Sequence, residues 1–412
     1  MDDMTYREID GGVCAASGFK AYGIHAGLRK NAAKLDLAMI AADKKCNAAG
    51  VYTKNKVFAA PVGVTRAHLS NGTAQAVICN SGNANACTPD GYETAEKTCA
   101  AVADVLGIAA DDVIVASTGV IGVSLNTEPI TSGILRLADL LKDDADGSDK
   151  AALAIMTTDT QKKEFALSFT CGGKDIHIGG ICKGSGMIHP NMGTMLCFIT
   201  TDCAITSDAL NTALHAAIEN TFNMVTVDGD TSTNDMVTVL ASGDAGNTEI
   251  SDTASDDYAV FAEALRLICK KLALSIAADG EGATKLLICH VTGAKNDADA
   301  RTLAKSVIAS SLVKAAMFGS DANWGRVICA LGYSGVDFDT TKVDISFSSD
   351  LGSLKVCENG GSYDFSEEFA KMVLSCKKVV IECCMNDGTA EAEAYGCDLS
   401  YEYVRINGDY RS

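Results

Sequence analysis

Short apolar runs recur along the chain and alternate irregularly with amphipathic stretches. The runs are rich in Val, Ile and Phe, as buried strands are, and they read AQAVICNSG, DVIVAST, KEFALSFTC, KDIHIGGIC, KLLICHVTG, KVDISFSS and KVVIECCMN. Apolar residues at helical spacing predict helices over 207–222, about 256–278 and 366–374, the first capped by Ser207 and the second ended by Gly280. In FALSFTCGGKDIHIGG, two such runs flank a Gly-Gly pair and predict a β-hairpin. The mixture predicts an α/β fold of the α+β type, with much antiparallel sheet, rather than a regular βαβ nucleotide-binding fold.

No linker divides the chain into obvious parts. It has four prolines and 38 glycines among 412 residues, with no Pro/Ser-rich stretch, charge run or fixed-period repeat. With 47% apolar residues it is long enough for one large domain or two ordinary ones. The start, MDDMTYREIDGG, is acidic and no apolar run reaches the ~18 residues of a membrane helix. We therefore expect neither a targeting segment nor a membrane span, and a cytoplasmic location.

The net charge limits the kinds of binding partner, and the cysteine pattern argues against disulfide bonds. Lys and Arg number 34 and Asp and Glu 53, so the net charge of −19 disfavours nucleic acid and anionic membranes and leaves small molecules. The 17 cysteines form no C-x-x-C pair, and Cys79, Cys289 and Cys329 stand inside apolar runs. Buried free thiols are expected rather than disulfides, including the adjacent Cys383 and Cys384.

Common cofactor and metal motifs are missing from the sequence. There is no G-x-x-x-x-G-K-[ST], no G-x-G-x-x-G between strand and helix, and no H-E-x-x-H. Asp228, Asp230 and Asp235 in VDGDTSTNDM do not form a calcium loop, since Thr233 replaces its glycine and no Glu closes it. The histidines lack ligand spacing, so no metal is expected. A Ser/His/Asp catalytic triad remains an alternative, although the sequence contains no G-x-S-x-G motif.

The stretch KGSGMIHPNMGTMLCFITTD changes character at one bond, from Gly193 to Thr194. Small residues precede the bond and the apolar run 195–199 follows it. Attack of the Thr194 hydroxyl on the Gly193 carbonyl would convert the backbone to an ester, and the small residues permit the strained geometry. Hydrolysis would leave Thr194 as a new N-terminus, with a hydroxyl nucleophile and an α-amine of pKa ~8 as its base. The alternative is an ordinary loop that enters a core strand.

Ordered blocks over the whole chain resemble the ornithine acetyltransferase family of arginine biosynthesis. The blocks are GFKAYGIHAGLRK, VICNSGNANACT, VIVASTGVIG, MTTDTQKK, KGSGMIHPNMGTMLCFITTD, FNMVTVDGDTSTND, DGEGATKL, SSLVKAAMFGSDANWGRVICALGYSG and YGCDLSYEYVRINGDYRS. The resemblance implies a layered αββα-type sandwich, as in N-terminal-nucleophile-like aminopeptidases, with a smaller C-terminal α/β subdomain.

The resemblance also implies self-cleavage and a nucleophile. The cleavage site of the family matches the bond between Gly193 and Thr194 of this chain. Family members usually have Ala before the Thr. Residues 1–193 would form an α chain and 194–412 a β chain, with two such pairs in a heterotetramer. Thr194 matches the nucleophile, and Thr118 and Gly119 match an oxyanion hole made by a hydroxyl and a backbone N–H. Without the resemblance, STG would be an ordinary turn.

The substrate contacts carried over by resemblance are Thr157, Lys183, Thr194, Glu281, Asn407 and Ser412. Lys183 suits a substrate α-carboxylate and Glu281 suits the ammonium of ornithine. Taken alone, Lys183 would be a solvated surface group and DGEG a turn.

The implied reaction moves an acetyl group from N2-acetyl-L-ornithine to L-glutamate through an acetyl-Thr194 ester, without metal or bound cofactor. Many family members also act as N-acetylglutamate synthase, which would make acetyl-CoA a second donor. No CoA-phosphate motif is found, and the acidic composition indicates no basic patch for one. The alternatives are an N-terminal-nucleophile aminopeptidase or amidohydrolase of related fold, and an unprocessed, non-catalytic amino-acid-binding protein.

Overall fold

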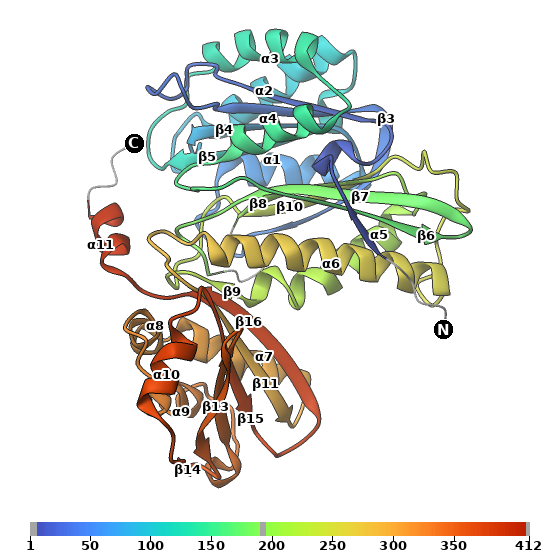
Figure 1. Cartoon of the computed structure of the whole chain (residues 1–412). Coiled ribbons are helices and arrows are strands. Elements are labelled where there is room, and N and C mark those ends of the chain that lie inside the picture. Colours follow the sequence, from blue (N-terminus) through green and yellow to red (C-terminus); the bar gives the residue numbers. More distant parts are fainter. Residues whose placement is uncertain (1–5, 190–194, 409–412) are drawn as a thin grey trace.

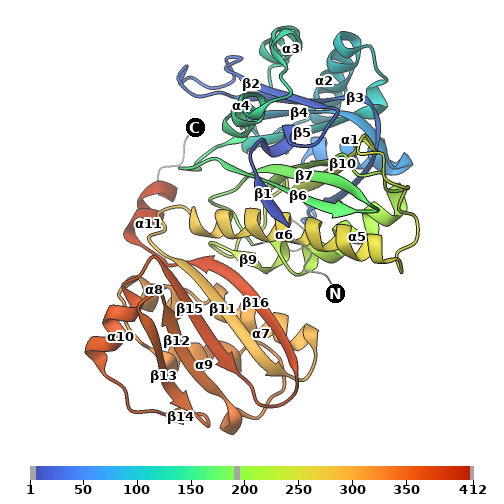
Figure 2. The ribbon, with the colours of Figure 1, turned by 45° about the vertical axis from the view of Figure 1, so that its right-hand side comes forward.

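The computed structural model describes residues 6–189 and 195–408 and contains two β-sheets in two lobes (Figures 1 and 2). The predicted residues Gly193, Thr194 and Ser412 lie outside the described residues. Within the described chain, no helix is both long and apolar enough to span a bilayer.

The larger lobe comprises β1 (Arg7–Ile9), β2 (Phe19–Ile24), β3 (Leu37–Tyr52), α1 (Ala60–His68), β4 (Thr73–Asn83), α2 (Gly91–Leu106), β5 (Val113–Val120), α3 (Glu128–Leu140), α4 (Ala145–Ile155), β6 (Lys163–Cys171), β7 (Lys174–Lys183), β8 (Leu196–Thr201), α5 (Ser207–Glu219), β10 (Met236–Ala241) and α6 (Asp256–Ala278). The smaller lobe comprises β9 (Val225–Thr226), β11 (Leu286–Ala294), α7 (Asp297–Ala309), α8 (Ser311–Phe318), α9 (Trp324–Gly332), β12 (Asp344–Ser349), β13 (Gly352–Glu358), β14 (Gly361–Ser362), α10 (Glu367–Leu374), β15 (Lys378–Cys384) and β16 (Ala390–Cys397). Helix α11 (Tyr401–Asn407) follows the smaller lobe, and short 3-10 turns occur at Gly12–Cys14, Leu69–Asn71, Ala110–Asp112, Phe222–Met224 and Thr340–Lys342.

The 16-residue strand β3 takes part in both layers of the larger lobe. Its first half pairs with β2 and β4 and its second half with β10, with a register irregularity between Ala41 and Cys46. The nine-stranded path, β1-β6-β7-β8-β10-β3-β4-β5 with β2 beside β3, therefore folds over at β3 into two packed layers. Ile114 of β5 and Phe198 of β8 share the apolar core between them.

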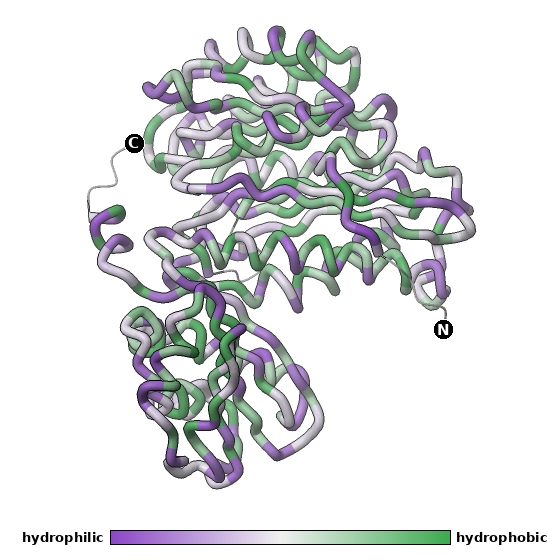
Figure 3. The backbone as a smooth tube through the Cα atoms, viewed as in Figure 1, coloured by the Kyte–Doolittle hydropathy of each residue, from purple (hydrophilic) through white to green (hydrophobic). Residues whose placement is uncertain are grey.

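Helices cover both outer faces of this sandwich (Figure 1). Helices α2 and α3 pack on the β4–β5 layer, and α5 and α6 pack on the layer that contains β6, β7 and β8. This is the αββα arrangement expected from the resemblance. All six residues of β8 are buried, which explains why its sequence, LCFITT, shows no polar–apolar alternation. In Figure 3 the hydrophilic stretches gather mostly at outer loops and strand ends.

The smaller lobe is the expected C-terminal α/β unit. Its seven-stranded sheet has the order β14-β13-β12-β15-β11-β16-β9, with α7 packed on β11 and β16. Strand β9 precedes β10 in the chain but pairs with β16, so it joins the two lobes.

Most local predictions are confirmed, with two corrections. The β6–β7 hairpin turns at Gly172 and Gly173, which have φ of 55° and 70°, and α6 spans the predicted residues. Ser207 is not a cap: Thr206 accepts from the N–H of Ala209, and α5 ends at Glu219. Strand β3 was not predicted, because its Ala-rich sequence carries a polar DKK in its middle.

The cysteines are free and mostly buried, as predicted, but two of them, Cys87 and Cys329, are exposed. All 17 are free; Cys79, Cys289 and Cys383 are buried and Cys384 is half-buried. Cys329 is exposed, because α9 is amphipathic and turns its other side, with Val327 and Leu331, toward the core.

Candidate active site

The ends of β5 and β7 meet although they belong to different layers of the sandwich. Thr118 lies near the end of β5 and Lys183 is the last residue of β7. The Lys183 ammonium donates to Thr118 Oγ1 at 3.2 Å, and both residues are buried. A lysine that the sequence alone would place at the surface thus lies beside a proposed oxyanion donor.

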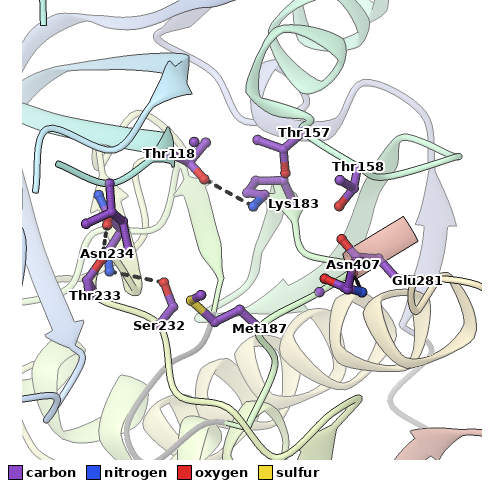
Figure 4. A pocket seen from close by; sticks show the side chains of 13 residues that line it. Thr118, Thr157, Thr158, Lys183, Met187, Ser232, Thr233, Asn234, Glu281 and Asn407 are labelled. Carbon is purple, nitrogen blue, oxygen red and sulfur yellow. Dashed lines mark hydrogen bonds between the residues drawn. The ribbon is translucent and has the colours of Figure 1, made fainter. Parts of the chain in front are cut away.

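Six of the predicted site residues line one pocket of about 130 Å³. Its lining residues are Thr118, Gly119, Ile121, Thr157, Thr158, Lys183, Gly186, Met187, Ser232, Thr233, Asn234, Glu281 and Asn407. Figure 4 shows Thr118, Thr157 and Lys183 together on one side, with Glu281 and Asn407 on the other. The remaining predicted residues, Thr194 and Ser412, lie outside the described chain.

Gly119 occupies a position that only glycine can fill. Its φ is 136°, and a Cβ there would lie 2.2 Å from the carbonyl carbon of Gly82 and 2.5 Å from the nitrogen of Asn83. Strand β4 therefore lies tight against the end of β5, and this contact sets the direction of the Gly119 backbone. Thr118 is held from the other side, because Asn234 Nδ2 donates to the carbonyl oxygens of Ser117 (2.8 Å) and Ala84 (2.6 Å).

Asp159 connects the two pocket segments that contain Thr157 and Lys183. One of its oxygens accepts from Gly184 N (2.8 Å) and Lys163 Nζ (2.7 Å), and the other accepts from Thr157 N (2.9 Å). Burial would raise the pKa of this carboxyl, but the charges of Lys163 and Lys183 outweigh burial and lower it to about 2. An ionised Asp159 thus positions the backbone on both sides of the pocket.

Lys163 completes this buried ion cluster. Its ammonium also donates to Asp279 Oδ2 at 2.6 Å, and Ser185 Oγ donates to the Asp279 carbonyl at 2.7 Å. Lys163 and Asp159 are almost fully buried, so each charge depends on the others for compensation.

Glu281 forms the opposite wall. Its N–H donates to Ser185 O at 3.0 Å, and Asn407 Nδ2 of α11 donates to its Oε2 at 2.7 Å. Gly186 permits this position, because a Cβ at residue 186 would lie 2.3 Å from the Glu281 carboxyl carbon. Glu281 is 7% exposed and has no cationic side chain within ion-pair distance in the described residues. A buried carboxylate with such sparse compensation suits a cationic ligand group.

The segment 228–235 has a role at this site that the sequence analysis did not find. The Asp228 carboxylate accepts from the backbone N–H groups of Met187 (2.6 Å) and Ile188 (2.9 Å), which fixes the pocket loop. Asp235 is 1% exposed, and its Oδ2 lacks a hydrogen-bond partner in the described part of the chain. Burial raises the pKa of Asp235 well above its usual range. The dense polar run DGDTSTND, directly ahead of an apolar strand, was the available signal.

The pocket combines an anion-binding end with a cation-binding end. Lys183 and the Thr118 hydroxyl suit a carboxylate and a developing oxyanion, and Glu281 suits an ammonium group. Within residues 6–189 and 195–408, no group of three or more His, Cys, Asp or Glu side chains is arranged to hold a metal ion. The arrangement therefore suits an amino acid with a charged side chain.

Comparison with known proteins matches nearly the whole sequence to one family. The ArgJ family model matches residues 20–412. The "Arginine biosynthesis bifunctional protein ArgJ 1" of Clostridium acetobutylicum is 51% identical over 396 residues, 96% of each chain. The bifunctional protein ArgJ of Symbiobacterium thermophilum is 50% identical over 406 residues, 98% of this chain and 99% of that protein. A crystal structure of ArgJ from Bacillus halodurans is 47% identical and covers 52% of this chain and 98% of its own, with a TM-score of 0.49.

Proposed function

The chain belongs to the ArgJ family of arginine-biosynthesis acetyltransferases, and on that premise we propose that it moves the acetyl group of N2-acetyl-L-ornithine to L-glutamate. The products are L-ornithine and N-acetyl-L-glutamate. The family and the enzyme class expected from the sequence motifs are thereby confirmed.

One observation carries the substrate assignment: Lys183 and Glu281 present opposite charges to one small pocket. Acetylornithine has an α-carboxylate at one end and an ammonium on its side chain. With the carboxylate at Lys183 and the ammonium at Glu281, the acetyl carbonyl lies toward Thr118 and Gly119. Each charged group of the ligand then leaves water and pairs with a side chain of opposite charge in a partly buried pocket.

The reaction proceeds in two half-reactions through Thr194. Its hydroxyl oxygen attacks the acetyl carbonyl carbon, and the α-amine of a processed Thr194 takes the hydroxyl proton. The Thr118 hydroxyl and the Gly119 N–H stabilise the tetrahedral oxyanion. The C–N bond then breaks, and the proton passes to the departing amine of ornithine. The glutamate amine attacks the acetyl-Thr194 ester in the same way, which restores the hydroxyl and needs neither metal nor bound cofactor.

Self-cleavage between Gly193 and Thr194 generates this nucleophile. It would yield chains of 193 and 219 residues (412 − 193), which pair and associate as a heterotetramer. Intact-mass measurement and N-terminal sequencing test this: the C-terminal chain should begin TMLCF. Thr194→Ala should remain one chain and be inactive, whereas Thr194→Ser keeps a hydroxyl and should still be cleaved. Cleavage at another bond would contradict the assignment of Thr194 as the nucleophile.

A single assay separates acetyl transfer from the two alternatives. The protein is incubated with N2-acetyl-L-ornithine, with and without L-glutamate, in the presence of EDTA. An acetyltransferase should release one equivalent of ornithine per active site when glutamate is absent. It should turn over repeatedly only when glutamate is present. Steady ornithine release without glutamate would identify a hydrolase, because water would be the acceptor. An uncleaved and inactive wild-type chain would identify a binding protein.

A further inference from the structure

One buried carboxyl oxygen beside the active site is unpaired. Asp235 is 1% exposed, and its Oδ2 has no hydrogen-bond partner in the part of the chain that the structure describes. The buried Asp159, by contrast, accepts three hydrogen bonds. Burial of a polar atom without a partner is unfavourable, so such an atom next to a reactive site points to a role in the chemistry.

The backbone around Asp235 is fixed by two neighbouring strands. The Asp235 carbonyl accepts from the N–H of Thr53, just past the end of β3, at 3.0 Å. The next residue, Met236, donates its N–H to the Met195 carbonyl at 2.8 Å. Thr53 Oγ1 donates to the Ser232 carbonyl at 2.9 Å and holds the segment from its other end. The Asp235 carboxyl is therefore kept in the interior.

This pairing brings Asp235 close to the predicted cleavage bond. Strands β10 and β8 run parallel, and the hydrogen bond from Met236 to Met195 sets Asp235 beside the start of β8. Neighbouring strands lie about 4.8 Å apart, and consecutive Cα atoms are about 3.8 Å apart. The bond between Gly193 and Thr194 comes one residue before Met195 in the chain, so it is within reach of a side chain at position 235.

The surroundings of the Asp235 carboxyl favour its neutral form. Burial raises the pKa of Asp235 well above its usual range. The charge of Lys183 and the hydroxyls of Ser232 and Thr53 lower it, but they do not offset burial. These groups act on the carboxyl from the end of β7, from its own segment and from the end of β3. A neutral carboxyl has a proton to donate, and Oδ2 faces no acceptor within the described residues.

The proposed self-cleavage has one step that needs a proton donor. When the Thr194 hydroxyl attacks the Gly193 carbonyl, the peptide C–N bond breaks and the departing nitrogen has to gain a proton, because an amide anion is too basic to leave. The Thr118 hydroxyl and the Gly119 N–H serve the oxygen of this intermediate rather than its nitrogen. The nitrogen therefore requires a separate acid.

We propose that Asp235 is the proton donor of self-cleavage. The inference rests on the proposed function, because it needs Thr194 as the nucleophile. The Thr194 oxygen bonds to the Gly193 carbonyl carbon, the C–N bond breaks, and the Asp235 carboxyl gives its proton to the nitrogen. The hydroxyl proton then passes to the Asp235 carboxylate, so Asp235 is unchanged after the shift from amide to ester. Water splits the ester into the Gly193 carboxyl and the Thr194 hydroxyl, and the new α-amine becomes the partner of the unpaired Asp235 oxygen.

The test measures the cleavage rate of newly made chains. Wild type, Asp235→Asn and Thr238→Val are synthesised in a cell-free system with radiolabelled Met, and loss of the 412-residue chain is followed by denaturing electrophoresis. General acid catalysis typically contributes 10²–10⁴-fold, so Asp235→Asn should be cleaved about 100-fold more slowly or worse. Thr238→Val is the matched control, because it removes another buried oxygen that has no partner in the described chain. It should be cleaved at the wild-type rate.

Two further readouts separate a proton donor from a structural residue. The ratio of the wild-type rate to the Asp235→Asn rate should fall as the pH rises from ~6 to ~10, because an ionised Asp235 has no proton to give. Hydroxylamine at neutral pH cleaves an ester but leaves a peptide bond intact. It should not speed the cleavage of Asp235→Asn, because this variant is blocked before the ester forms.

Each other outcome contradicts the inference. Cleavage of Asp235→Asn at the wild-type rate, or a rate ratio that does not change with pH, would show that Asp235 donates no proton. Cleavage restored by hydroxylamine would assign Asp235 to hydrolysis of the ester instead. If Asp235→Asn shows no cooperative melting transition, the wild-type pH profile decides alone, and a cleavage rate that does not fall at high pH overturns the inference. Wild type that is never cleaved before Thr194 would refute the proposed function itself.

Discussion

Lys183 Nζ donates to Thr118 Oγ1 at 3.2 Å across the two layers of the sandwich. Strands β7 and β5 are separated in the sheet by β8, β10, β3 and β4, so only the fold of β3 brings their ends together. The contact places a positive charge next to the hydroxyl that should bind the reaction's oxyanion. The hydroxyl accepts from Lys183 and still has its own proton to donate.

Thr118→Ala should therefore slow both acetyl transfer and self-cleavage, because both pass through a tetrahedral oxyanion. Loss of one oxyanion donor typically costs about 10²–10³ in kcat. Thr118→Ser retains the hydroxyl and is the control. Cleavage is followed by denaturing electrophoresis and transfer by ornithine release. A Thr118→Ala enzyme that cleaves normally and changes only KM would make Thr118 a substrate contact.

Glu281→Gln should raise KM for acetylornithine much more than KM for glutamate. The variant removes the charge that faces the ornithine ammonium, and glutamate has a second carboxylate that Glu281 repels. Loss of one partner of a desolvated pair costs about 2–5 kcal/mol, so the effect is well resolved in steady-state kinetics. Lys183→Met is the comparison variant. It should weaken the binding of both acetylornithine and glutamate, since both have an α-carboxylate. Small, equal effects of Glu281→Gln on both substrates would make Glu281 a structural residue.

Gly186→Ala should raise KM for acetylornithine in the same direction as Glu281→Gln, but less strongly and without changing any charge. The new Cβ would overlap the Glu281 carboxyl group at 2.3 Å, so the carboxylate must move away from the pocket. We expect a rise in KM for acetylornithine of about tenfold, equivalent to ~1.4 kcal/mol. Gly332→Ala is the control, since its Cβ meets nothing within 4 Å. Unchanged KM values for Gly186→Ala would show that the position of Glu281 does not govern ornithine binding.

Asp159→Asn should destabilise the protein in a pH-dependent manner. The pKa of Asp159 is lowered from 3.8 to about 2 in the folded state, so the folded protein favours the ionised form. This stabilisation is fully present above pH ~4 and is lost as the pH falls toward 2, and a shift of this size amounts to about 2–3 kcal/mol. The difference in melting temperature between wild type and variant should shrink over that interval. Asp350→Asn, at an exposed turn, controls for simple charge removal. A pH-independent difference would mean that hydrogen-bond loss, not charge, explains the effect.

Local sequence patterns predicted many helices and strands of this protein, and motif matches predicted its family. The β6–β7 hairpin and helix α6 follow from short-range apolar periodicity and turn residues, which act over a few positions. The ordered blocks led to the family, and only that resemblance pointed to Thr118 and Gly119 in STG and to Glu281 in DGEG. The boundary between chains 1–193 and 194–412, the nucleophile Thr194, the cytoplasmic location and the absence of a cofactor stay predictions.

The tertiary structure alone decided which charges meet. Lys183 meets Thr118 only because β3 folds the sheet into two layers that bring the ends of β7 and β5 together. Arg29, Lys30 and Lys34 are close together in the sequence, but only the folded chain places their loop beside Thr157. Sequence periodicity reports which face of an element is buried, but it carries no information on which element lies opposite. Burial and charge pairing set the electrostatics of such a site, and both depend on neighbours far away in the chain.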